Sequence, residues 1–335
     1  MKKFTIVAGI DVSKLKLDVS ILVEAGQKHP HYFLIENNRK GILKLFGAIE
    51  KLGISLKEVL FCFEHTGIYT MHLCSTLQEF DYAYSMVPAI EIKRSVGLIR
   101  GKSDKADSRT IALYAITHTH KLNLTALPER ALMKLKLLLV EKQKHKKAIL
   151  SLSSTDEQIG FMPKELLKDI LVVNQQSIKK LKKSLKAIDE MITELVNSHG
   201  ELKEKFDLVC SVPGIGRETA LYLIMYTKNF TCFDNWRQMA CYAGIAPFGY
   251  SSGSSIKGRS KVSMIANRKL KSLLTLGALA AIRHDKQIKD YYQRKVEEGK
   301  NKMLVINAVR CKMISRAFAV INRGNPFIDT FKFAA

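Results

Sequence analysis

The order of strand-like and helix-like segments in the first third of the chain limits its fold more than any other feature. Three short runs rich in β-branched and aromatic residues come first, at Phe4 to Asp11, Leu17 to Val23 and Tyr32 to Ile35. A helical pattern, a compact apolar run, a second helical pattern and a further strand-like run follow, at Arg39 to Leu52, Val59 to Phe63, Tyr69 to Phe80 and Tyr82 to Val87. Strands separated by helices normally pair in parallel through crossovers, so this order predicts a mixed sheet flanked by helices.

The rest of the chain has the pattern of helices. From Leu127 to Phe206 the composition is rich in Lys, Leu, Ile, Glu and Gln, and it predicts a long antiparallel helical hairpin or coiled coil. The region from Leu208 onward is again mainly helical, with a glycine turn and a loop at Gly249 to Ser263 that is dense in Gly, Ser, Lys and Arg. We therefore expect an α/β domain over residues 1–126, a basic helical spacer over 127–206 and an all-α C-terminal domain over 207–335.

The composition departs from the average of globular proteins in its charge. Among 335 residues there are 54 Lys and Arg against 31 Asp and Glu, a formal net charge of +23. A polyanion is the expected partner, because each neutralised phosphate releases counterions, and nucleic acid is favoured over an anionic membrane or a merely soluble basic surface. Basic residues of the helical spacer either track a nucleic-acid backbone or form a solvated helix face.

Other features of the sequence indicate the compartment. No apolar run approaches the roughly 20 residues that cross a bilayer, and the first residues do not resemble a secretory signal, so we expect a cytoplasmic protein. The six cysteines are scattered without a C-x-x-C pair, which disfavours a zinc finger and suits reduced, buried thiols.

Four carboxylates stand against the basic trend, at places where the predicted fold would bring them together. Asp11 ends the first strand, Glu64 ends the fourth, and Asp104 and Asp107 share one face at the start of a predicted helix, Asp104 to Thr117. If the first and fourth strands are neighbours, these acids cluster and need cations, and oxygen ligands of this kind suit Mg²⁺. Each acid alone has an ordinary alternative, as a helix cap, a first-turn acid or a turn former.

The segments around these acids resemble a known family. Gly9 to Lys14, Glu64 to Tyr69 and Arg100 to Asp107 look like the signature blocks of the DEDD transposases of bacterial insertion sequences, the bridge-RNA-guided recombinases. The resemblance implies an N-terminal domain with the RuvC-like form of the RNase H fold, and metal-ligand roles for the four acids. A competing P-loop interpretation of Gly97 to Ser103 is rejected, because three residues separate its glycines where four are required.

The glycine turn has two interpretations. Pro213 to Gly216, followed by Arg217, resembles the hairpin of a helix-hairpin-helix, in which Gly214 and Gly216 let backbone N–H groups approach a phosphate. The alternative is a plain turn between core helices. A dinucleotide-binding fingerprint is excluded, because Thr219 stands where its third glycine belongs.

The serine-rich loop resembles the C-terminal transposase domain of the same family. Over Ala243 to Gly253, the serine directly before glycine is the family's nucleophile, a place that Ser252 takes here. By residue type alone this is a flexible surface loop, in which Ser251, Ser254 and Ser255 compete for the role. Nearby cations are expected to hold the scissile phosphate: Lys257, Arg259, Lys261, Arg268 and Lys269.

The resemblance implies an enzyme, a DNA transposase or recombinase that excises and inserts a mobile element by Mg²⁺-dependent strand breakage with a serine nucleophile. Its implied partners are donor and target DNA, a structured bridge RNA, and further copies of the chain in a dimer or tetramer acting at the nucleoid. One alternative is an RNase H-like nuclease such as a junction resolvase, in which metal-activated water does the cutting. Another is a non-catalytic nucleic-acid-binding protein whose acids are only helix caps.

Overall fold

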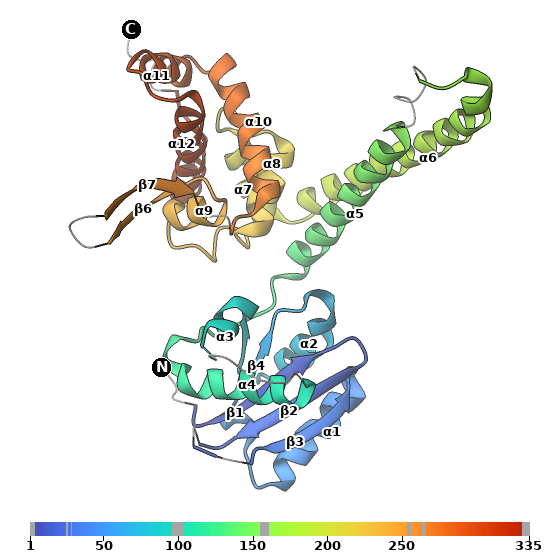
Figure 1. Cartoon of the computed structure of the whole chain (residues 1–335), viewed down its shortest axis with the longest axis vertical. Coiled ribbons are helices and arrows are strands. Elements are labelled where there is room, and N and C mark those ends of the chain that lie inside the picture. The colour runs from blue at the N-terminus through green and yellow to red at the C-terminus, as the bar shows by residue number, and fades with distance from the viewer. Residues whose placement is uncertain are drawn as a thin grey trace. The chain divides into compact units, whose positions relative to one another are not determined.

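The computed structural model describes residues 4–24, 26–27, 29–95, 103–154, 161–252, 256–262 and 265–329, without the side chains of 164 and 248–261. The chain forms two compact units, Met1–Leu127 and Pro128–Ala335. The first unit holds a mixed sheet with helices, and the second is mainly helical (Figure 1). An α/β part followed by an all-α part is the fold class that the sequence predicts.

The sheet of the first unit has five strands in the order β3-β2-β1-β4-β5. The strands are β1 (Ile6–Val12), β2 (Lys16–Leu22), β3 (His31–Glu36), β4 (Val59–Glu64) and β5 (Tyr84–Val87). Strand β2 pairs antiparallel with both β1 and β3, whereas β1–β4 and β4–β5 are parallel pairs. The expectation that the first and fourth strands are neighbours in a mixed sheet is confirmed.

Helices cover both faces of this sheet. On one face, α1 (Arg39–Lys51) and α2 (Met71–Glu79) bury the apolar side chains of alternate strand residues, such as Ile10, Val19 and Phe61. On the other face lie α3 (Ala89–Ser95) and α4 (Asp104–Thr117), against Val7, Leu60 and Cys62. Short 3₁₀ turns occur at Leu56–Glu58, Gly67–Thr70 and Thr119–Lys121. Because side chains alternate along a strand, the residues that share a face with Val7 on β1 are Gly9 and Asp11.

Helix α4 packs directly on the backbone of β1, at Gly9. A Cβ atom at Gly9 would lie 2.2 Å from the amide nitrogen of Ala112 and 2.5 Å from the carbonyl oxygen of Ser108. No side chain fits in that space, so glycine is what allows the helix to approach. The helix begins after the N-cap Ser103, whose side chain accepts a hydrogen bond from the amide of Ala106 at 3.2 Å.

The second unit begins with two long paired helices, α5 (Arg130–Ser153) and α6 (Lys164–Asn197), which run alongside each other in Figure 1. Their shared core includes Leu135 and Leu139 from α5 and Ile188 and Ile192 from α6. Helix α6 starts directly after its N-cap residue Pro163.

The remaining helices form a second core around α10 and α12. They are α7 (Gly200–Cys210), α8 (Arg217–Tyr226), α9 (Trp236–Tyr242), α10 (Arg268–His284), α11 (Lys286–Glu297) and α12 (Lys302–Arg323). Fully buried side chains such as Val209, Leu274 and Met313 join them. Within the described residues, no helix is both long enough and apolar enough to cross a membrane.

Two expectations for this unit are wrong. Within the described residues, the predicted loop at Gly249 to Ser263 instead consists of two strands, β6 (Pro247–Ser252) and β7 (Ile256–Val262), paired antiparallel from Pro247↔Val262 to Ser252↔Ile256. Backbone hydrogen bonds hold such a ribbon without alternating apolar side chains, so the composition did not indicate strands. The cysteines are free thiols as expected, but none of the four in this unit is buried: Cys232, in the turn that follows α8, is exposed, and the other three are partly buried, at Cys210, Cys241 and Cys311.

Candidate metal centre and nucleic-acid-binding elements

Three carboxylates meet at one end of β1. Asp11 is the next to last residue of β1, and Asp104 and Asp107 lie in the first turn of α4. One oxygen from each of the three lies within 4.8 Å of the others. The alternation along β1 turns Asp11 toward α4, and the spacing of three residues turns both helical acids toward Asp11.

Glu64 stands beside this cluster and not within it. It is the last residue of β4, and it follows the parallel pair Ile10↔Phe63 just as Asp11 does on β1. It shares the α4 face of the sheet with Cys62, by the alternation of β4. The structure therefore brings Asp11, Asp104 and Asp107 together and holds Glu64 next to Asp11.

The acids of the cluster repel one another. Burial, and then the neighbouring charges of Asp107, Asp104, Asp18 and Glu64, raise the pKa of Asp11 to about 6 from 3.8. Converging carboxylate oxygens are the donors that a hard divalent cation prefers, so the residues present fit such an ion. Asp11, Asp104 and Asp107 would hold it, with Glu64 at hand.

Three further residues at this site were not predicted from the sequence. The side chain of Asp18 is 3% exposed and lies opposite Asp11 in the β1–β2 register. The Tyr32 hydroxyl donates a hydrogen bond to Asp18 Oδ1, and Lys16 Nζ lies 3.4 Å from Asp18 Oδ2 and 2.7 Å from Asp104 Oδ2. A signal did exist: Leu17 and Val19 alternate with Asp18 along β2, which places the acid on the α4 face.

Asn37 joins two of the signature segments. Its buried side-chain amide donates to the carbonyl of Ser13 at 2.8 Å and to the carbonyl of Tyr69 at 2.9 Å. Ser13 follows Asp11 in the first segment, and Tyr69 ends the segment that begins at Glu64. The side chain of Asn37 thereby links the two segments by hydrogen bonds.

The serine hairpin belongs to the second unit. Ser252 ends β6, and Ser251 pairs with Lys257. Arg259 and Lys261 also lie on β7, while Ser254 and Ser255 lie outside the described residues, as does most of Gly97 to Ser103 in the first unit. The side chains of the residues from 248 to 261 are likewise outside the description, so the roles expected for them stay predictions.

Two cations expected to hold phosphate have partners within the chain. Lys269 Nζ lies 3.3 Å from Glu218 Oε1 and 5.1 Å from the ring centre of Tyr222. Arg217 donates to Thr193 Oγ1 at 2.6 Å. A phosphate would have to compete with these contacts. Arg268, at the start of α10, is exposed.

The two glycines of the turn have different surroundings. Gly214 has φ +85°, and a Cβ there would lie 2.6 Å from the carbonyl oxygen of Gly277 on α10. Gly214 is therefore needed for packing between core helices, which is the plainer interpretation of the turn. Gly216, at the start of α8, has nothing within 4 Å of an added Cβ. There is therefore room at Gly216 for a phosphate to approach the turn.

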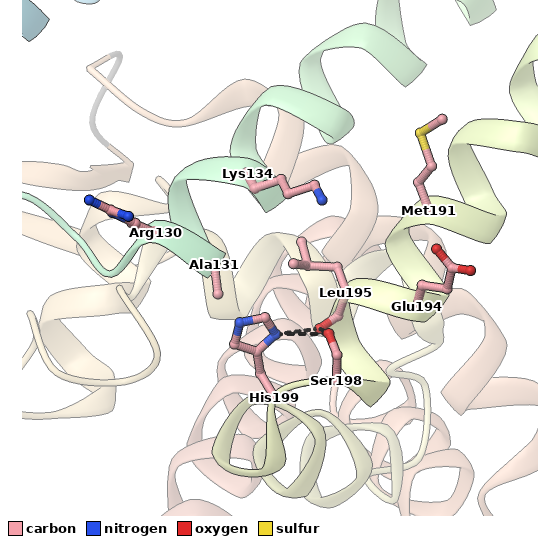
Figure 2. Close-up of a pocket in the computed structure, with 8 residues that line it drawn as sticks. All are labelled: Arg130, Ala131, Lys134, Met191, Glu194, Leu195, Ser198 and His199. Carbon is pink, nitrogen blue, oxygen red and sulfur yellow. Dashed lines mark hydrogen bonds between the residues drawn. The ribbon is translucent and has the colours of Figure 1, made fainter.

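A hollow of about 430 Å³ opens where α5, α6 and α7 meet. Figure 2 shows its lining, with Arg130 and Lys134 on α5 and Glu194 on α6. Ser198 and His199 complete the lining, with 3.0 Å between Ser198 Oγ and His199 Nδ1. Its apolar lining comes from Ala131, Met191 and Leu195. None of the predicted catalytic residues lines it.

Two family models match the chain. The DEDD transposase model of IS110-type elements matches residues 8–155, and the model described as the transposase IS116/IS110/IS902 family matches residues 206–293. The first spans all four acids together with Gly9, and the second spans the glycine turn and the β6–β7 hairpin. The chain belongs to the IS110 family of DEDD transposases.

Relatives of known name agree with this membership. The pilin gene-inverting proteins of Moraxella bovis and Moraxella lacunata are each 25% identical over 323 residues, covering 95% of this chain and 96% of the relative. A 43.6 kDa protein of the insertion element IS110 in Streptomyces coelicolor is 30% identical over 170 residues, covering 50% of this chain and 41% of that protein. As a member of the IS110 family, the chain is a DNA transposase or recombinase, and the family implies a divalent metal and DNA substrates.

Proposed function

We propose that this IS110-family transposase breaks and rejoins DNA with Ser252 as nucleophile, with Mg²⁺ held by the four acids, and under the guidance of a structured bridge RNA. The observation that carries the proposal is the approach of Asp11, Asp104 and Asp107 to within 4.8 Å beside Glu64. These three acids and Glu64 are the four that stand at the ends of the predicted strands and helix. The proposed division is a catalytic domain at 1–126, a helical spacer at 127–206 and a serine-bearing domain at 207–335.

The carboxylates would act by orienting the reacting groups. A divalent cation bound there would stabilise charge on phosphate oxygens and make an oxygen nucleophile easier to deprotonate. Mg²⁺ is proposed over Ca²⁺ because it is held by few carboxylates and takes substrate phosphates as further ligands. The Asp11 carboxyl must be ionised to bind the cation, and its raised pKa means that binding competes with protons below about pH 6.

The proposed covalent step conserves the bond energy of the DNA backbone. Ser252 Oγ forms a bond to the phosphorus, the bond from phosphorus to one sugar oxygen breaks, and that oxygen takes a proton. The serine proton passes to a base, and attack of another sugar hydroxyl on the phosphoserine ester reverses the step to rejoin the strands. No histidine occurs between residues 249 and 263, so the base must come from elsewhere. We propose that the carboxylate cluster serves, from the same subunit or another subunit of a dimer or tetramer.

The names of the relatives support a proposal for the type of rearrangement. Those that match nearly the full length of this chain are named for inverting a pilin gene, and another is named for an insertion element. We propose that this chain moves or inverts a DNA segment in the bacterial cytoplasm, with donor and target DNA chosen by pairing with RNA. Sequencing of the nucleic acid that co-purifies from cells carrying the flanking element DNA tests this choice: absence of a recurrent structured RNA contradicts it.

The metal site is tested by Asp11→Asn, which removes one ligand charge with little change in volume. Strand transfer should be lost, while folding and nucleic-acid binding persist. Asp81→Asn is the matched control, because Asp81 is an exposed residue of the same unit with φ 54°, a conformation that Asn tolerates. Recombination by Asp11→Asn at the wild-type rate contradicts the site.

The nucleophile is tested by trapping protein joined to a DNA end. The adduct should survive boiling in detergent, and it should be absent in Ser252→Ala but present in Ser251→Ala. Asp104→Asn should also prevent it if the carboxylates assist the serine. An adduct that persists in Ser252→Ala identifies a different nucleophile, and strand cleavage that never forms an adduct favours the RNase H-like nuclease. If Mg²⁺ produces no strand cleavage at all, the non-catalytic binding protein is favoured.

A further inference from the structure

The candidate metal centre includes one cationic side chain of the protein itself, the ammonium group of Lys16. Its Nζ atom lies 2.7 Å from Asp104 Oδ2 and 3.4 Å from Asp18 Oδ2, so one ammonium bridges two carboxylates. Asp104 is one of the three acids that converge, whereas Asp18 lies outside that group. Lys16 thus neutralises part of the charge at the same carboxylate that would bind a metal ion.

The two partners of Lys16 differ in their access to water. The side chain of Asp104 is 50% exposed, whereas that of Asp18 is 3% exposed. An exposed ion pair contributes little and separates at little cost, because water solvates both partners. A buried carboxylate that loses its counter-ion is strongly destabilised. Separating Lys16 from Asp104 therefore costs little free energy, whereas separating it from Asp18 costs much more.

Asp18 itself is fixed in place. The Tyr32 hydroxyl donates to its Oδ1, and the ammonium of Lys105 lies 4.8 Å from the centre of the Tyr32 ring. Its Oδ2 accepts no hydrogen bond from the described residues, which leaves the ion pair with Lys16 as the described contact of that atom. Asp18 is thus a buried, hydrogen-bonded anchor for Lys16 at the edge of the cluster.

We propose that Lys16 is an exchangeable counter-ion of the metal centre. In the metal-free protein it pairs with Asp104 and limits repulsion among the converging acids. When a divalent cation binds Asp104, the Lys16 ammonium separates from that carboxylate and keeps its ion pair with Asp18. Lys16 therefore lowers the affinity for the cation, and Asp18 with Tyr32 positions it. This inference rests on the proposed metal site.

The test measures cation binding by the full-length protein without DNA or RNA, by titration with Mn²⁺ and detection of free Mn²⁺ by electron paramagnetic resonance. Lys16→Gln removes the competing charge and should bind Mn²⁺ about fivefold more tightly, as expected for loss of a mostly exposed ion pair. Lys16→Arg keeps the charge and should bind no more tightly than wild type. Lys44→Gln, an exposed position on α1, loses the same charge away from the site and should match wild type.

The outcomes separate this inference from the site on which it rests. Wild-type protein that binds no Mn²⁺ contradicts both the metal site and the exchange. Wild-type binding with equal or weaker binding by Lys16→Gln overturns the exchange alone. Equal tightening by Lys44→Gln also overturns it, because the effect would then be one of net charge. Tighter Mn²⁺ binding by Lys16→Gln alone supports the proposal. If Lys16→Arg binds Mn²⁺ no more tightly than wild type, the effect does not come from a general loosening of the β1–β2 hairpin.

Discussion

Gly9 sets the distance between β1 and α4, and so the distance between Asp11 and the helical acids. A methyl group there would meet the backbone of Ala112 at 2.2 Å, and a helix backbone cannot yield as a flexible side chain does. We expect Gly9→Ala to lower the free energy of unfolding by about 1–3 kcal/mol, and to weaken Mn²⁺ binding because α4 is displaced. Urea denaturation and Mn²⁺ titration measure the two effects.

Gly47 provides the control for this change. It lies within α1, and an added Cβ there has nothing within 4 Å. Gly47→Ala should stabilise the protein by about 0.5–1 kcal/mol through the lower flexibility of alanine in the unfolded chain. If the two variants have equal stability, the close contact at Gly9 does not govern the packing of α4.

The raised pKa of Asp11 fixes the sign of a pH effect on the metal-free protein. Because the folded protein holds the Asp11 proton with a pKa of about 6, against 3.8 ordinarily, protonation favours the folded state. That contribution is complete below about pH 4 and is lost as the pH rises through about 6. In EDTA, the Tm of wild type relative to Asp11→Asn should therefore fall across this range. A saturating divalent cation should reduce the fall, and a constant difference in EDTA would contradict the raised pKa.

Among the elements, the turn before α8 and the helix α10 depend on each other. Gly214 and Gly277 are in backbone contact, and a Cβ at Gly277 would lie 2.3 Å from the carbonyl oxygen of Gly214. We expect Gly277→Ala to cost about 1–3 kcal/mol of stability, whereas Gly216→Ala, facing open space, should cost less than about 1 kcal/mol. Urea denaturation of both variants measures this difference. Equal losses would mean that the turn tolerates side chains throughout.

The elements that sequence reasoning predicted are those whose side chains alternate or repeat with one buried face. The strands of the first unit and the carboxylates at their ends follow from that periodicity, since β1 and β4 each carry an acid just where the apolar run stops. The hairpin of β6 and β7 has no such repeat, and only its backbone pairing defines it. Its strands were therefore not predictable from apolar spacing.

The site was predictable to the same degree as the strands. Converging acids follow from strand and helix ends, but the Lys16 bridge between Asp18 and Asp104 joins residues 88 apart in sequence, counted from Lys16 to Asp104. Which lysine pairs with which acid depends on how α4 lies across β2, and the contact at Gly9 decides that position. Local patterns predict the candidate metal ligands, whereas their pairing with Lys16 depends on tertiary packing.

At the scale of the whole molecule, the positive charge is spread unevenly. The formal net charge is +23, and most of the excess lies in residues 128–335, while the carboxylate cluster lies in residues 1–127. The first unit thus carries the candidate metal ligands, and the second carries most of the positive charge that would attract a polyanion. Lys269 pairs with Glu218 and Lys142 with Asp189, but each such pair cancels within the net charge, so the excess lies on other cations.

Nucleic-acid binding by the full chain should therefore weaken steeply with salt. Each phosphate neutralised on duplex DNA contributes about −0.9 to the slope of log affinity against log salt concentration. Fluorescence anisotropy with a labelled duplex, between about 50 mM and 200 mM salt, measures the slope and hence the number of phosphates contacted. Arg268→Gln, at an exposed cation, should make the slope shallower by about 0.9, whereas Lys44→Gln in the other unit should leave it unchanged. A slope near zero for wild type would mean that the excess charge only solvates the surface, since binding without counterion release does not respond to salt.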